Sequence, residues 1–208
     1  MSSDTSTLAD PYPSRPGDVS VPPASGIHHR WSPVRFATDQ EVETGDLTAI
    51  LEAARWSASC FGEEPWRFLV ARRKAPWREK VEDALADGNA WARRASLLLV
   101  GVTKRTFSRN GKPNDYARHD LGMALKSMMV EAAAQGLVTH AMAGFDAEAV
   151  RKDFQVPDDY DPAWTLAVGH YDPELADAKL AGRDGKKRAR TPLNDLLFGA
   201  RFGETPTL

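Results

Sequence analysis

The 208-residue sequence contains a single cysteine, Cys60, and no long apolar run. A lone cysteine cannot form a disulfide within the chain, and a structural zinc site normally takes several Cys or His ligands at close spacing. The longest apolar stretch, Leu97 to Val102, is far shorter than a membrane span, and the first residues lack the pattern of a signal peptide. We therefore expect a cytoplasmic protein with no disulfide, no structural metal and no membrane partner.

The sequence also lacks an excess of charge of either sign and the common catalytic motifs. Its 27 Lys and Arg residues stand against 29 Asp and Glu residues, a formal net charge of -2, so no overall basic field attracts nucleic acid. The glycine-rich turn of dinucleotide folds, the P-loop, H-E-x-x-H and G-x-S-x-G are all missing, and the five histidines have no metal-ligand spacing. These absences direct attention to a cofactor, because protein side chains offer no evident catalytic group.

Apolar periodicity predicts one α/β domain in residues 28–208, preceded by a flexible arm in residues 1–27. The arm is rich in proline and has few large apolar residues that could offset the entropy of ordering. In the domain we expect longer helices at 47–56, 76–86 and 115–135, short helices after Asp146 and at 192–198, and strands at 68–70, 97–102 and 164–168.

The helix expected at 115–135 gives the strongest signal and ends before Gly136, which suits a left-handed C-terminal cap. Its apolar positions cover more than one face. Such a helix is either central to a core or shared with another subunit, and we favour the shared alternative.

Four separated segments become informative when they are taken together. In order and spacing they resemble the FMN-binding nitroreductase family, and the resemblance extends from about His28 to Gly203. It is strengthened by the stretches at 88–91 and 119–122. The four segments are Arg30-Trp31-Ser32-Pro33, the stretch from Ser57 to Trp66, Met142-Ala143-Gly144-Phe145-Asp146 and Arg188-Ala189-Arg190-Thr191-Pro192.

The resemblance implies an α+β fold of the three-layer α/β/α type, with a central, mainly antiparallel sheet and a long central helix. It also implies a homodimer with FMN at the subunit interface. The implied phosphate and ribityl contacts come from Arg30, Ser32, Arg188 and Arg190, with Trp31 between the first two. Guanidinium groups are good phosphate partners, but either end alone would be an ordinary helix cap or a solvated basic tail.

The other implied contacts surround the flavin ring. Ser59, Cys60 and Glu64 lie in the loop that packs beside the ring in the family, and Asn89 corresponds to a polar contact with its pyrimidine edge. The backbone of Ala143 and Gly144 matches the position that faces flavin N5, where glycine allows close approach. Cys60 is interpreted as a flavin contact rather than a nucleophile, because it has no partnered base.

The sequence departs from the family at the ring. Family members usually have Pro, Asn and Gln where this chain has Ala58, Gly62 and Glu64, and Arg or Lys where it has Val34; Arg35 follows one residue later. A carboxylate at 64 and a missing cation at 34 both disfavour an anionic reduced flavin. We therefore expect a lowered flavin potential or a weaker FMN affinity.

The function implied by the resemblance is transfer of hydride from NADH or NADPH to FMN N5, and then of electrons to a nitroaromatic, quinone or similar small electrophile, by a ping-pong mechanism. One alternative keeps the flavin but changes the reaction to biosynthetic dehydrogenation, dehalogenation or flavin breakdown. A flavin-free, non-enzymatic binding module is a third hypothesis.

Overall fold

The computed structural model describes residues 23 and 25–206, so most of the expected arm, residues 1–27, lies outside the described residues. Helix α1 (Ser25–His28) includes the last residues of the expected arm and packs on helix α4 (Ala117–Ala134). A Cβ at Gly26 would come within 3.0 Å of Val130 Cγ1. None of the described helices is long and apolar enough to cross a membrane.

Within the described chain, four antiparallel strands form one sheet in the order β1-β2-β4-β3. The strands are β1 (Trp66–Arg72), β2 (Leu97–Lys104), β3 (Val138–Met142) and β4 (Tyr160–Gly169). The predicted strands at 68–70, 97–102 and 164–168 are confirmed as parts of β1, β2 and β4. The sequence analysis missed β3, which forms the edge of the sheet beside β4.

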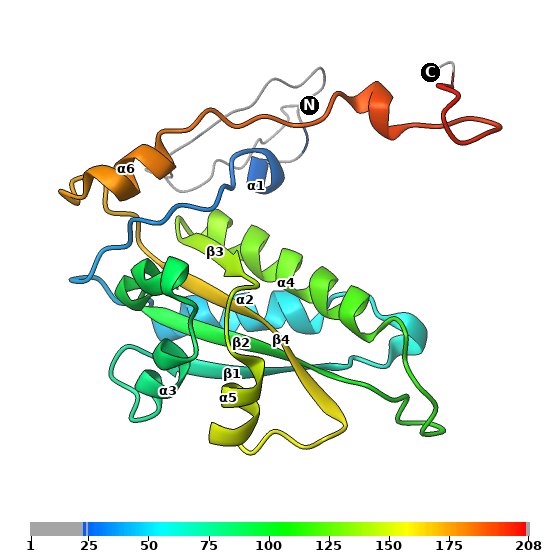
Figure 1. Ribbon diagram of the computed structural model, residues 1–208, viewed down its shortest axis with the longest axis horizontal. Coiled ribbons are helices and arrows are strands. Elements are labelled where there is room, and N and C mark those ends of the chain that lie inside the picture. Colours follow the sequence, from blue (N-terminus) through cyan, green and yellow to red (C-terminus); the bar gives the residue numbers. More distant parts are fainter. Residues whose placement is uncertain (1–22, 24, 207–208) are drawn as a thin grey trace, which may run out of the picture.

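Helices cover both faces of the sheet and give the three layers of an α+β fold (Figure 1). Helices α2 (Thr44–Arg55) and α4 lie on one face, and α3 (Arg78–Asp83), the 3-10 helix η2 (Asp87–Arg94) and α5 (Ala147–Asp153) lie on the other. Helix α2 begins earlier than expected, so Asp46 lies in its first turn rather than at its cap. Gly136 follows α4 and has a φ of 77°, which confirms the predicted left-handed C-terminal cap.

Strand β2 carries the core on both of its sides. Leu97, Leu98, Leu99 and Val100 are completely buried. Because successive side chains of a strand point to opposite faces, Leu97 and Leu99 pack with α2 and α4, whereas Leu98 and Val100 pack with the opposite layer. The alternation explains why this stretch reads as one continuous apolar run.

The carboxyl-terminal part of the chain leaves the sheet and returns to the amino-terminal helix. After β4, helix α6 (Ala178–Asp184) lies near α1, and the chain then extends past α1 to the 3-10 helix η3 (Leu193–Leu196) (Figure 1). The sequence analysis did not predict α6. Four large apolar side chains at the far end are exposed, namely Leu193, Leu196, Phe198 and Phe202.

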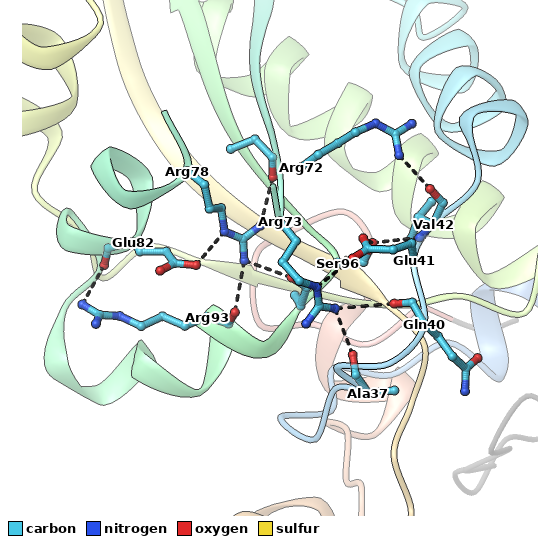
Figure 2. A network of polar contacts seen from close by, with 12 residues as sticks. Ala37, Gln40, Glu41, Val42, Arg72, Arg73, Arg78, Glu82, Arg93 and Ser96 are labelled. Carbon is cyan, nitrogen blue, oxygen red and sulfur yellow. Dashed lines mark hydrogen bonds and ion pairs between the residues drawn. The ribbon is translucent and has the colours of Figure 1, made fainter. Parts of the chain in front are cut away.

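A polar network centred on arginines ties α3 to the sheet (Figure 2). The buried Arg78 donates from Nη1 to the Ala71 carbonyl at 2.9 Å and from Nη2 to the Ala95 carbonyl at 2.9 Å and the Arg93 carbonyl at 3.2 Å. Its Nε donates to Glu82 at 2.7 Å. Burial lowers the pKa of Arg78, and Glu82 opposes that effect. One guanidinium therefore satisfies carbonyls at the end of β1 and before β2.

His140 joins β3 to the segment that follows α1. Its Nδ1 lies 2.8 Å from the Pro33 carbonyl oxygen, which can only accept, so Nδ1 carries the proton. The imidazole also packs on Trp91, with ring centroids 4.5 Å apart. Burial lowers the pKa of His140, and the bond to Pro33 raises it by less. The side chain is therefore held neutral, which explains how a histidine fits inside this short strand.

Replacing Arg78 by Met is expected to lower the free energy of unfolding by about 3 kcal/mol, because buried carbonyls lose their donors at about 1–3 kcal/mol each. Urea denaturation followed by circular dichroism measures the change. Arg55→Met is the control, since the exposed Arg55 pairs with Glu52 and lies over the Trp56 ring at the surface of α2. Equal stability of the two variants would contradict the structural role of Arg78.

The pKa shift of His140 predicts a pH dependence of stability. Because its folded pKa lies below the ordinary value of about 6.5, the unfolded chain takes up the proton first as the pH falls. The stabilisation is complete above about pH 6.5 and decreases below it, with a slope of at most about 1.4 kcal/mol per pH unit. His140→Gln should show a flatter dependence between pH 6.5 and pH 5 in urea melts. If the free energy of unfolding of the two proteins differs by the same amount at every pH between 5 and 8, the prediction is wrong.

Candidate functional site

A basic pocket of about 320 Å³ lies where the two ends of the described chain meet. Six of its nine lining residues are Arg or Lys, and none is acidic. Cations gathered in this way repel one another, so a bound anion lowers their electrostatic free energy. The lining consists of Arg30, Trp31, Ser32, Arg183, Lys186, Lys187, Arg188, Ala189 and Arg190.

Hydrogen bonds orient the two sides of this pocket. Arg30 Nη1 donates to Ser32 Oγ at 3.3 Å, within the segment that follows α1. Arg188 Nη1 donates to the His28 carbonyl at 3.0 Å, across 160 residues of sequence. The structure thus brings Arg30, Ser32 and Arg188 together with Arg190, as the sequence analysis expected. Whether these groups hold a phosphate stays a prediction.

Trp31 lines this pocket although it is almost completely buried. Its side chain is 5% exposed and packs edge-to-face on Tyr171, with ring centroids 5.4 Å apart. The indole belongs to the core beneath the pocket, so a ligand could touch only its edge or its main chain.

Lys126 is a further cation near this pocket that the sequence analysis missed. It lies on α4, and its pKa is lowered by burial and then by the positive charges of Arg30 and Arg188. Coulombic coupling of this kind shows that the three side chains share one electrostatic environment. The sequence offers no signal for Lys126, because a lysine on the polar side of a helix is ordinary.

A buried carboxylate holds the two pocket segments side by side. Asp184, the last residue of α6, accepts from the Val34 backbone N–H at 2.9 Å and from Arg35 Nε at 3.2 Å. The Val34 side chain is 2% exposed and belongs to the core. Neither Val34 nor Arg35 lines the pocket. The position where the family usually has a cation therefore points into the core here, and the neighbouring arginine is used in the scaffold.

Asn89 and Gly144 form a second group of predicted site residues. Asn89 Nδ2 donates to the Gly144 carbonyl at 2.9 Å, and the Ala86 N–H donates to the same oxygen at 3.1 Å. A Cβ at position 144 would lie 2.9 Å from Asn89 Nδ2, so a larger residue there would displace the Asn89 amide. Ala143 and Gly144 are exposed, as a backbone contact to a ligand requires.

The loop that carries Ser59, Cys60 and Glu64 lies elsewhere and contributes nothing to the lining of the basic pocket. It contains the 3-10 helix η1 (Cys60–Gly62) and is fixed to α4, since the Cys60 N–H donates to the buried Asp120 carboxylate at 2.9 Å. The Glu64 N–H donates to Ser59 Oγ at 3.0 Å. In Figure 1 this loop lies beside the first turns of α4, whereas α1 and α6 lie toward its other end.

Two residues of this loop have unusual backbone angles. Phe61 and Glu64 have φ of 56° and 47°, in the left-handed region that non-glycine residues rarely adopt. The Phe61 ring is 74% exposed, and the Arg109 guanidinium lies over it, 4.0 Å from the centroid. Phe107 lies edge-on to the same ring, with centroids 6.1 Å apart. The loop and residues 107–109 therefore form one aromatic and cationic surface.

Comparison with known proteins places this architecture in a family. The model described as the Nitroreductase family matches residues 27–103 and 88–170 of the chain. An uncharacterized 15.4 kDa protein in the ask 5′ region of Mycolicibacterium smegmatis is 35% identical over 147 residues, which cover 66% of this chain and 97% of that protein. Protein DrgA of Synechocystis sp. is 28% identical over 195 residues, covering 80% of this chain and 88% of that protein.

A solved structure gives the same result. The crystal structure of an oxidoreductase containing FMN is similar with a TM-score of 0.83 and 29% identity, and the match covers 90% of this chain and 96% of that one. The likeness therefore extends over most of both chains. The chain belongs to the nitroreductase family.

Proposed function

We propose that this protein is an FMN-dependent oxidoreductase. The observation that carries the proposal is the basic pocket, in which Arg30 and Ser32 from one end of the chain meet Arg188 and Arg190 from the other. The relative that contains FMN and shares 29% of its residues supports the identity of the cofactor.

The residues fit a flavin phosphate. A phosphate offers three strongly accepting oxygens and a charge near -2, and guanidinium groups are well suited to it because they donate from a planar fork. Arg30, Arg188 and Arg190 would hold the phosphate, with support from the Ser32 hydroxyl and the charge of Lys126. The bond from Arg30 to Ser32 holds these two groups in place before the ligand arrives.

The ring would lie against η2 and the segment after β3. Asn89 holds the carbonyl of Gly144 and thereby orients the peptide between Gly144 and Phe145, which follows the Gly144 N–H. When bound, FMN would supply a hydride acceptor at N5, reduced by NADH or NADPH and reoxidised by a nitroaromatic, quinone or similar electrophile in ping-pong order. The task of the chain is placement and electrostatics, so no acid–base side chain is required.

Three observations support a homodimer in which each ring site is completed by the partner. The loop of Ser59, Cys60 and Glu64 is fixed to α4 away from the basic pocket of its own chain, so a second copy is the natural source of these ring contacts. The exposed apolar residues after α6, including Leu196 and Phe202, suit a surface covered by another subunit. The partly buried apolar side chains of α4 are consistent with such an interface.

A more specialised flavin reaction is the second candidate. It is favoured by the altered loop, where Gly62 and Glu64 replace residues usual in the family, and the two candidates share the cofactor but differ in how readily a nicotinamide reduces it. We also propose a cytoplasmic location, because a lone thiol and small diffusible reactants suit a reducing compartment.

Purified protein is expected to be yellow, to elute as a dimer of the 22.9 kDa chain in light scattering, and to consume NADH or NADPH steadily with a quinone or nitroaromatic. Anaerobic mixing with each nicotinamide measures flavin bleaching directly. Bleaching that is slow with both donors would favour the specialised reaction. A colourless protein that ignores added FMN would contradict both flavin functions and favour a binding module.

Glu64→Gln is expected to raise the flavin midpoint potential. Glu64 is exposed, so removing its charge should contribute about 1 kcal/mol, or roughly 20 mV for a two-electron reduction. Glu63→Gln is the matched control, since it makes the same charge change one residue away in a carboxylate bound to the Ser108 N–H at 2.5 Å. Spectroelectrochemical titration measures both variants. An unchanged potential in Glu64→Gln, or an equal shift in Glu63→Gln, would exclude a specific influence of Glu64.

A further inference from the structure

The ion pair between Arg35 and Asp184 joins the two chain segments that line the basic pocket, although neither residue lines it. Arg35 Nε lies 3.2 Å from Asp184 Oδ2, and the two side chains are 14% and 2% exposed. The second carboxylate oxygen of Asp184 accepts from the Val34 N–H at 2.9 Å. Both oxygens of a buried carboxylate therefore bind one short segment of the opposite chain end.

The remaining donors of Arg35 extend this connection to a third segment. Its Nη1 donates to the Pro173 carbonyl at 2.7 Å, and its Nη2 donates to the Tyr171 hydroxyl. Tyr171 in turn packs on the Trp31 ring, beneath the pocket. Arg35 thus links the segment after α1, the segment after β4 and the end of α6.

The distances along the chain are short on both sides of the pair. Asp184 lies four residues before Arg188, and Arg35 lies three residues after Ser32. A chain rises at most about 3.3–3.6 Å per residue, so each partner lies within about 15 Å of the pocket residue on its own segment. The pair also neutralises Asp184, which would otherwise attract the pocket cations Arg183 and Lys186 away from a ligand.

We propose that Arg35 and Asp184 are positioning residues for the phosphate end of the cofactor site. They set the spacing between Arg30 and Arg188, which line the pocket from its two sides. The inference rests on the proposed flavin function. It adds a role for two residues that do not touch the ligand.

A positioning role makes a distinctive prediction, because FMN and riboflavin share the ring and differ by the phosphate. Loss of the pair should weaken FMN and leave riboflavin nearly unchanged. A merely structural role would weaken both flavins together or lower the melting temperature alone. The preference for FMN over riboflavin is therefore the decisive measurement.

The experiment uses the full chain stripped of flavin, titrated with FMN and with riboflavin by fluorescence quenching. In Asp184→Asn, which keeps the shape and loses the charge, the dissociation constant for FMN should rise about tenfold, since hydrogen bonds of charged groups are involved. In Arg35→Lys, which keeps the charge and loses the fork, it should rise about threefold. Riboflavin affinity should change less than twofold in both variants.

The matched control is Glu41→Gln. Glu41 pairs with Arg73 Nε at 3.0 Å, through the same guanidinium nitrogen as the pair at the pocket but at a more exposed position, and it lies in the network of Figure 2. Neither residue of that pair lines the pocket. This variant should bind both flavins as the unmodified protein does. Arg188→Ala is the positive reference and should lose FMN affinity at least as strongly as Asp184→Asn.

Inorganic phosphate at constant ionic strength is a second probe of the pocket, read from the rise in melting temperature. It should stabilise the unmodified protein and stabilise Asp184→Asn less. Unchanged FMN and phosphate affinity in both variants would overturn the inference, and so would an equal loss of FMN and riboflavin. If Asp184→Asn does not fold, Arg35→Lys decides. An unmodified protein that binds phosphate but neither flavin would overturn the proposed function alone, and the phosphate measurements would then decide the role of the pair.

Discussion

The buried carboxylate of Asp184 is the interaction on which the two-ended pocket depends. The arginines and lysines that line this pocket repel one another, so contacts that hold their two segments together are needed. Asp184 does so through the Val34 N–H and the Arg35 guanidinium, both of which are needed to offset the cost of burying its charge. The sheet carries the core, but this pair determines where its two chain ends meet.

Much of the fold could be predicted from apolar periodicity, and the failures have physical causes. The run Leu97 to Val102 and the helix ending at Gly136 gave strong signals because β2 is buried on both sides and α4 is long and capped. Strand β3 was missed because it is short and contains Thr139 and His140, and the histidine is tolerated only through the distant Pro33 carbonyl. Helix α6 lies in a polar segment, although Asp177 caps it by accepting from the Leu180 N–H at 2.9 Å.

The candidate site could be predicted only when its separate sequence segments were considered together. Arg30 and Arg188 are separately ordinary surface residues, and nothing in their own surroundings reveals that they meet. The resemblance brought them together, and the structure places them in one pocket. The resemblance could not indicate Lys126, which lies on α4 and is coupled to Arg30 and Arg188 only through the fold. Nor could it indicate that Arg35 binds a carboxylate 149 residues away.

The two ends of the site differ in how they are built, and this difference bears on function. At the proposed phosphate end, cations converge from segments held by a buried ion pair. At the proposed ring end, the loop presents Phe61 and Glu64 with strained backbones, at a cost on the order of 1–3 kcal/mol each. The bond of the Glu64 N–H to Ser59, the Asp120 carboxylate and the Arg109 guanidinium stabilise that loop. These contacts offset the strain while the Phe61 ring stays exposed, so the loop is a preformed surface. The loop does not line the pocket of its own chain, so in the proposed homodimer the residues that distinguish this protein from its family would act on the flavin of the partner.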